Sequence, residues 1–147
     1  MRTIRKVYTR SISAGVYGTI CLPFTAKPGQ NVSVYQVAGR DRENHTIFAE
    51  PVEIMEAGIA YIYKSHSNHI RFYRESEGEV RLPKTGQPLM GTFVRCPDLD
   101  RHSFVLIGDE WYPASDCLTV EANCAWLVPL RTPISSGSLA MRINDRL

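Results

Sequence analysis

The sequence predicts an all-β protein, a sandwich of two mainly antiparallel sheets or a barrel-like variant of that fold. Short runs of β-branched and aromatic residues, separated by Gly, Pro, Asn and Asp, recur along the whole chain. No window carries apolar residues at helical spacing for more than a turn or two, so we expect no long helix. This rhythm of short strands and frequent turns is typical of sandwiches and barrels.

The length and composition indicate one domain with one sizeable core. The chain has 147 residues, of which 44% are hydrophobic and 22% charged, as in ordinary globular proteins. We find no internal repeat, no low-complexity tract and no linker that separates two parts. We therefore expect a single all-β domain that spans residues 1–147.

The expected strands follow one another with few residues between them. Gly108-Asp109 has the composition of a two-residue hairpin turn between Ile107 and Glu110. Pro51 interrupts one strand, so we expect a bulge or an edge position there, because proline cannot donate to a ladder. The expected strands are residues 4–10, 17–24, 32–38, 45–54, 59–64, 69–73, 79–82, 89–94, 103–107, 110–113, 124–130 and 138–143.

The stretch "ISAGVYGTICLPF", residues 12–24, has the pattern of a strand that is covered on both faces. Strand alternation separates Ile20, Leu22 and Phe24 from Tyr17, Thr19 and Cys21. Cys21 is then a small buried residue, and we expect a free thiol that does no chemistry. The chain has four cysteines and no C-x-x-C, which favours buried thiols but leaves one or more disulfides open.

Charge and hydropathy exclude two classes of partner. The net charge is +2, and the basic residues Arg2, Arg5, Lys6 and Arg10 are spread along an expected strand instead of forming a patch, so we expect no nucleic acid partner. No apolar run approaches the ~20 residues of a membrane span. The N-terminus has no apolar segment of the kind found in a secretory signal, so it leaves open a cytoplasmic protein or an exported one without its signal.

No motif for catalysis, metal binding or phosphate binding stands out. His66 and His69 flank one turn, but a zinc site needs three or four protein ligands. Asp98 and Asp100 lack the spacing of a calcium loop, and neither G-x-S-x-G nor a phosphate-binding loop is present. We therefore assign no catalytic residue, metal or cofactor, and we expect no enzymatic activity. The alternative is a carbohydrate-active or proteolytic enzyme whose site leaves no trace in the sequence.

The aromatic pair Trp111-Tyr112 is the candidate ligand contact. Adjacent residues of a strand face opposite sides, so one of the two rings points away from the core. The neighbouring Asp109 and Glu110 would offer hydrogen-bond acceptors to the hydroxyl groups of a glycan. The other interpretation is that both rings are covered, as most aromatics in small β proteins are.

Several motifs in order resemble an all-β module near the C-terminus of many secreted and cell-surface proteins of gut bacteria. The resemblance covers about residues 8–143. It rests mainly on "AGVYGTICLPF" at 14–24, with weaker support from "EAGIAYIY" at 56–63, "MGTF" at 90–93, "FVLIGDEWY" at 104–112, "ANCAWLVPL" at 122–130 and "SLAMRI" at 138–143. Tyr17, Ala60 and Trp126 stand where the family more often has Trp, Pro and Tyr.

The resemblance implies a secreted or cell-surface location, a sandwich-like fold and no established enzymatic activity. It supplies no catalytic residues, because the shared positions are mostly apolar, Gly and Pro. We therefore expect a non-catalytic structural or interaction module of an exported bacterial protein. Its expected role is adhesion, through contact with a glycan or another surface protein.

Overall fold

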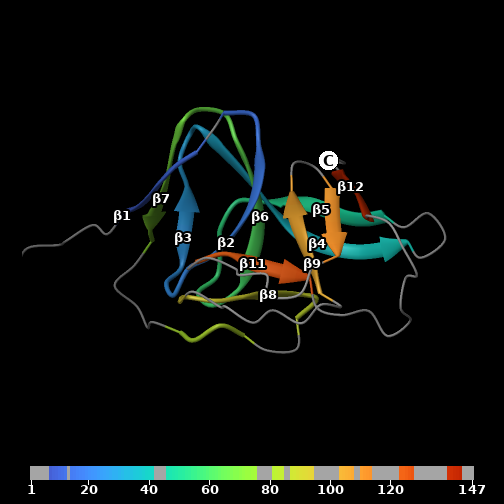
Figure 1. Cartoon of the computed structure of the whole chain (residues 1–147). Coiled ribbons are helices and arrows are strands. Elements are labelled where there is room, and N and C mark those ends of the chain that lie inside the picture. The colour runs from blue at the N-terminus through green and yellow to red at the C-terminus, as the bar shows by residue number, and fades with distance from the viewer. Residues whose placement is uncertain are drawn as a thin grey trace, which may run out of the picture.

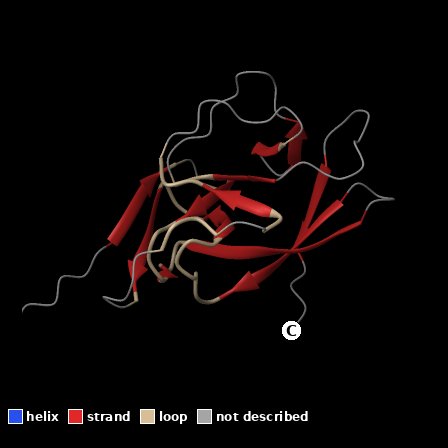
Figure 2. Cartoon of the chain, turned by 90° about the horizontal axis from the view of Figure 1, so that it is seen from below, coloured by secondary structure: helices blue, strands red, loops and turns tan. Residues whose placement is uncertain are grey.

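The computed structural model confirms the all-β fold, and the residues that it describes contain strands and no helix (Figures 1 and 2). It describes residues 7–12, 14–41, 46–75, 81–84, 87–94, 103–107, 110–113, 123–127 and 139–143. The strands are β1 (Val7–Ser11), β2 (Tyr17–Cys21), β3 (Ala26–Pro28), β4 (Val32–Asp41), β5 (Thr46–Val52), β6 (Ala60–Ser65), β7 (His69–Arg74), β8 (Leu89–Gly91), β9 (Phe104–Ile107), β10 (Glu110–Pro113), β11 (Ala125–Leu127) and β12 (Leu139–Ile143).

The strands form two sheets of unequal size. The small sheet has the order β1-β7-β3, and the large sheet has the order β2-β6-β4-β5-β12-β10-β9-β11-β8. Among the described strands, β12 and β5 pair in parallel and every other pairing is antiparallel. Figure 1 shows the small sheet on the left, β9 and β12 on the right, and β11 and β8 below.

The large sheet curls until its first strand, β2, reaches the segment that leads into β11. The N–H of Cys21 donates to the carbonyl of Asn123 at 3.0 Å, and the Asn123 side-chain amide donates back to the Cys21 carbonyl at 3.0 Å. Thr19 makes a similar exchange with the backbone of Ala125, at 2.9 and 3.1 Å. Asn123 adopts the left-handed conformation (φ 60°), which asparagine tolerates better than most residues. These bonds give the large sheet a barrel-like shape.

Strand β2 separates two hydrophobic cores. Cys21 lies in the barrel core, while Ile20 and Leu22 lie in the sandwich core beneath the small sheet, as strand alternation predicts. The barrel core comprises Cys21, Ile47, Ala49, Ala60, Ile62, Leu89, Phe104, Trp111, Ala125 and Leu127. The sandwich core comprises Ile20, Leu22, Ala26, Val32, Val34, Met55, Tyr61, Tyr63, Ile70 and Phe72. Phe24 is only partly buried against the sandwich core.

Cys21 is a buried free thiol with no exposed surface, so the prediction for this residue is confirmed. Burial raises the pKa of its thiol to about 12, which keeps it protonated and unreactive at neutral pH. Cys124 is also a free thiol and is half-buried. Cys96 and Cys117 lie outside the described residues.

Most expected strands are present, and the structure differs from the expectation at two places. The strand β3 was not expected, because its three residues contain Lys27 and Pro28 and carry too little pattern. It pairs with β7, and Ala26 forms a bridge to Met55. An expected strand at 79–82 is wrong where it is described, since Arg81 and Leu82 belong to no strand.

The structure also tests two local predictions, the bulge or edge position at Pro51 and the hairpin between Ile107 and Glu110. Pro51 pairs with Tyr35 of β4 but lies beyond the residues of β5 that pair with β12, so it has the expected edge position on that side. The bulge in β4 between Val37 and Gly39 lies opposite Phe48 and Ala49, not opposite Pro51. The hairpin of β9 and β10 is present, with Ile107 paired to Glu110. The turn residues Gly108 and Asp109 lie outside the described part of the chain.

Candidate functional site

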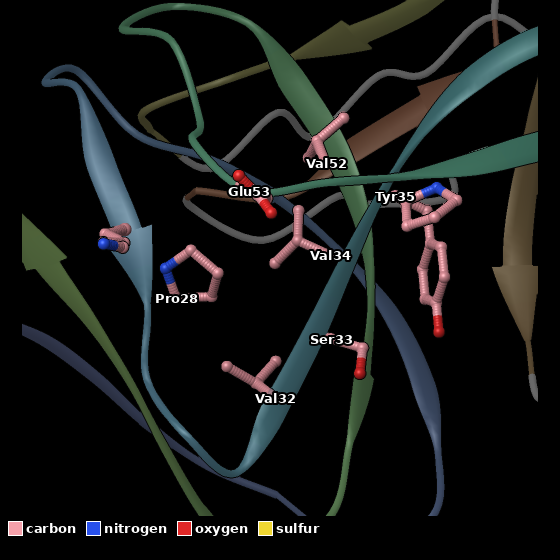
Figure 3. Close-up of a pocket in the computed structure, with 9 residues that line it drawn as sticks. Pro28, Val32, Ser33, Val34, Tyr35, Val52 and Glu53 are labelled. Carbon is pink, nitrogen blue, oxygen red and sulfur yellow. The ribbon is translucent and has the colours of Figure 1, made fainter. Parts of the chain in front are cut away.

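A surface hollow of about 540 Å³ lies between β3 and β4, and we call it the β3–β4 notch (Figure 3). Its volume falls in the range of ordinary ligand pockets, although it is open to solvent on one side. It was not anticipated from the sequence, because it depends on how two consecutive strands join different sheets. The lining residues are Lys27, Pro28, Val32, Ser33, Val34, Tyr35, Pro51, Val52 and Glu53.

The notch exists because β3 and β4 diverge immediately after the turn that connects them. Strand β3 enters the small sheet and β4 enters the large one. The end of β5 crosses between them: Val52 pairs with Val34 of β4, and Met55 bridges Ala26 of β3. The chain therefore fills one end of the space between the two strands, and the other end is the notch.

The register also determines which backbone groups face the notch. The N–H of His66 donates to the carbonyl of Asn31 at 2.8 Å, on the β6 side of β4. Because successive residues of a strand point their backbone groups in opposite directions, the N–H and C=O of Val32 point away from β6 and toward the notch. On the β3 side of the notch, the N–H and the C=O of Ala26 both bond to the backbone of Met55. Pro28 lies two residues further along β3, so its carbonyl points to the same side of the strand, toward the notch.

The notch has an apolar floor and polar groups at its rim. Val32 and Val34 are buried in the sandwich core and form the floor. Lys27 and Glu53 are exposed, and Figure 3 shows the Glu53 carboxylate directed into the space above Val34. Ser33 and Tyr35 lie on the opposite face of β4 from the two valines, as strand alternation requires.

Two serine–histidine contacts occur at the surface, and one involves Ser33, whose side chain lies on the face of β4 opposite Val32 and Val34. The Oγ of Ser33 lies 2.8 Å from Nε2 of His66, and the Oγ of Ser11 lies 3.1 Å from Nδ1 of His69. The two histidines that flank one turn therefore have different serine partners. Among the described residues, no three His, Cys, Asp or Glu side chains gather closely enough to hold a metal ion.

The side chains of the adjacent residues Trp111 and Tyr112 lie on opposite faces of the sheet. Trp111 is completely buried in the barrel core, so its ring cannot stack on a ligand, and this part of the candidate site is corrected. Tyr112 is 40% exposed, as strand alternation requires of the second residue. Glu110 lies on the same face as Tyr112 and is half-buried, and Asp109 lies outside the described residues.

The outer face around Tyr112 combines apolar and polar side chains on three adjacent strands. Tyr112 pairs with Val105 of β9, and Glu110 pairs with Ala140 of β12. Ile107, two residues after Val105, is 60% exposed on this face. Arg142, two residues after Ala140, is also exposed. We call this surface the Tyr112 face.

Arg10 is a partly buried cation, and its contacts are structural. Its guanidinium makes five hydrogen bonds, to the Tyr8 and Tyr63 hydroxyls and the backbone carbonyls of Thr19 and Asn123. Burial alone lowers the pKa of Arg10, but the nearby sulfur of Cys124 and the two tyrosines raise it more, so Arg10 stays charged. A guanidinium has five N–H donors, so these bonds leave none for an anionic ligand.

Comparisons with known proteins add no relative: no family model, no curated protein and no solved structure matches this chain. No helix among the described residues is long and apolar enough to cross a membrane. The two surfaces described above, the β3–β4 notch and the Tyr112 face, are therefore the candidate binding sites of this protein.

Proposed function

We propose that this protein is a non-catalytic interaction module of an exported bacterial surface protein, and that it contacts a glycan through the Tyr112 face. The observation that carries the proposal is the exposure of Tyr112 on an open sheet face while its neighbour Trp111 is buried. The exported location follows from the motif resemblance, and adhesion is the role that such a location favours.

The chemistry of the Tyr112 face suits a pyranose ring. A sugar presents C–H groups on its flat side, which pack on an exposed aromatic ring, and hydroxyl groups at its edge. Glu110 lies two residues before Tyr112 on β10, and Arg142 lies beyond Glu110 on β12, so they would supply an acceptor and donors to hydroxyls of a ligand that extends along the strand from Tyr112. Ala140, opposite Glu110 on β12, is small and exposed, so it presents no bulky side chain to a ligand beside Glu110.

A glycan array tests this proposal directly. We expect the full chain to bind a subset of glycans and Tyr112→Ala to lose most of that signal. Tyr73→Ala is the matched control, because Tyr73 is a comparably exposed tyrosine (36%) on the small sheet. The absence of any glycan signal, or equal loss in both variants, would contradict a glycan site at the Tyr112 face.

A second candidate function, a serine hydrolase, is favoured by the contact between Ser33 and His66 on the outer face of β4. In such a site the serine oxygen attacks an acyl carbonyl while Nε2 of the histidine accepts the hydroxyl proton, and the leaving group departs with that proton. This candidate ranks second because the pair is exposed and the notch is open. No carboxylate among the described contacts orients His66.

A fluorophosphonate probe followed by mass spectrometry separates the two candidates. A hydrolase would be labelled at Ser33, and Ser33→Ala would abolish the label. Ser11→Ala is the control, because Ser11 also contacts a histidine but does not line the notch. We expect no labelling above the level of denatured protein, as the binding module requires.

A further inference from the structure

The β3–β4 notch lies where the pairing of β5 along β4 stops, at Val34, two residues from Val32. Val34 pairs with Val52, and the same antiparallel register would bring residue 54 opposite Val32. The chain leaves that register after Val52 and crosses to β3, where Met55 pairs with Ala26. The segment 52–55 bends as it crosses from β4 to β3, and the notch lies beside it, on the side of the turn that connects these two strands.

We propose that the notch binds a short extended peptide, which adds to the free edge of β4 opposite Val32. This site is separate from the Tyr112 face, and the proposal does not depend on the glycan proposal. Strand addition is a common mode of peptide recognition, in which backbone hydrogen bonds hold the ligand and alternate side chains enter pockets.

The backbone groups at the notch favour a peptide over other ligands. Val32 presents an N–H and a C=O in the direction of the notch, which is the pair that one residue of an added strand requires. The β3 side presents only an acceptor, the carbonyl of Pro28, because proline has no N–H. A peptide backbone matches this arrangement, since its N–H groups alternate between the two sides.

The side chains around the notch would also select which peptide sequences bind. Val32 and Val34 form an apolar floor, so every second side chain of the peptide would be apolar. Glu53 directs its carboxylate into the notch from the end that the chain closes (Figure 3). We therefore expect a cationic group, a lysine or arginine side chain or a free amino terminus, near that end of the peptide.

The first test uses random heptapeptides displayed on phage and selected on the full chain, followed by titration of one selected synthetic peptide. Val32→Pro removes the N–H that faces the notch and leaves the β4–β6 bonds in place. Val32→Ala is the matched control, because it loses a similar part of the side chain but keeps the N–H. We expect Val32→Pro to weaken binding about tenfold or more relative to Val32→Ala, as loss of a backbone hydrogen bond predicts.

The second test changes only the peptide, so it remains valid if Val32→Pro fails to fold. The selected peptide is synthesised with one backbone N-methyl group at each position in turn. In an added strand, methylation abolishes binding at the residue whose N–H bonds to Val32, weakens it at the neighbour whose N–H faces the Pro28 carbonyl, and has little effect at residues beyond the notch. Equal binding by the two Val32 variants, a flat N-methyl profile, or failure to select any peptide would each overturn the proposal.

Discussion

The two hydrophobic cores on either side of β2 differ in whether the buried polar groups near them have hydrogen-bond partners. In the wall of the sandwich core, the guanidinium of Arg10 satisfies all five donors, and the buried hydroxyl of Ser65 bonds to the backbone of Val16. In the barrel core, the indole N–H of Trp111 is buried without a hydrogen-bond partner, and so is the hydroxyl of Ser103, which directly precedes β9. A buried polar group without a partner keeps its full desolvation cost.

This difference shows which part of the molecule is held by specific polar bonds and which by packing. Arg10 connects β1 of the small sheet to Thr19 of β2 and Tyr63 of β6, so it fixes the position of the small sheet on the large one. In the barrel, the bonds of Thr19 and Asn123 lie at the closure between β2 and the segment that leads into β11, while the interior packs through close contacts such as that between Gly91 and Cys21. Four substitutions test this comparison, from the largest expected effect to the smallest.

Leu22→Ala should cause the largest loss, about 2–5 kcal/mol of unfolding free energy, because Leu22 is buried in the sandwich core and its truncation leaves a cavity. Chemical denaturation followed by tryptophan fluorescence measures the change. Phe24→Ala should cost clearly less, since Phe24 is only partly buried. A denaturation midpoint for Leu22→Ala equal to that of the parent chain would contradict the assignment of this face of β2.

Arg10→Met should lower the unfolding free energy by about 2–4 kcal/mol, because the carbonyls of Thr19 and Asn123 and the Tyr63 hydroxyl lose their donor. Arg10→Lys is the informative companion, since it keeps the charge but cannot reach four acceptor groups at once. We expect Arg10→Lys to recover less than half of the loss. Full recovery would mean that the charge matters and the hydrogen-bond geometry does not.

Gly91→Ala should cost about 1–3 kcal/mol, the range for overpacking a core. A Cβ at position 91 would overlap the Cβ and Sγ of Cys21. Cys21→Gly removes that obstacle, so the double variant should be more stable than the sum of the two single changes predicts. Strictly additive free energies from thermal denaturation would refute this close approach of β8 to β2.

Ser103→Ala should have the smallest effect and the opposite sign, a gain of up to about 1 kcal/mol, because it removes a buried hydroxyl that has no partner. The matched control is Ser65→Ala, which removes an equally buried hydroxyl that does have partners. We expect Ser65→Ala to destabilise the protein by about 1 kcal/mol. If the two melting temperatures moved in the same direction, the two cores would not differ in this respect.

The sequence predicted those features that depend on neighbouring residues. The alternation along residues 17–24 indicated that β2 has two covered faces, and Cys21 and Leu22 lie in different cores as a result. Alternation also required one ring of Trp111 and Tyr112 to face away from the core. It did not indicate which one, since both residues suit either environment and the hydrophobic neighbours on the two faces are similar.

Only the tertiary structure determined the features that depend on pairing between distant segments. The parallel pairing of β12 with β5, the closure of the barrel through Asn123, and the bonds of Arg10 join residues that no local pattern relates. The notch has the same origin, because β3 is too short to carry a pattern and exists through its pairing with β7 and Met55. A period of two residues determines which face of a strand is apolar, but the choice of partner strand is set by packing of the whole chain.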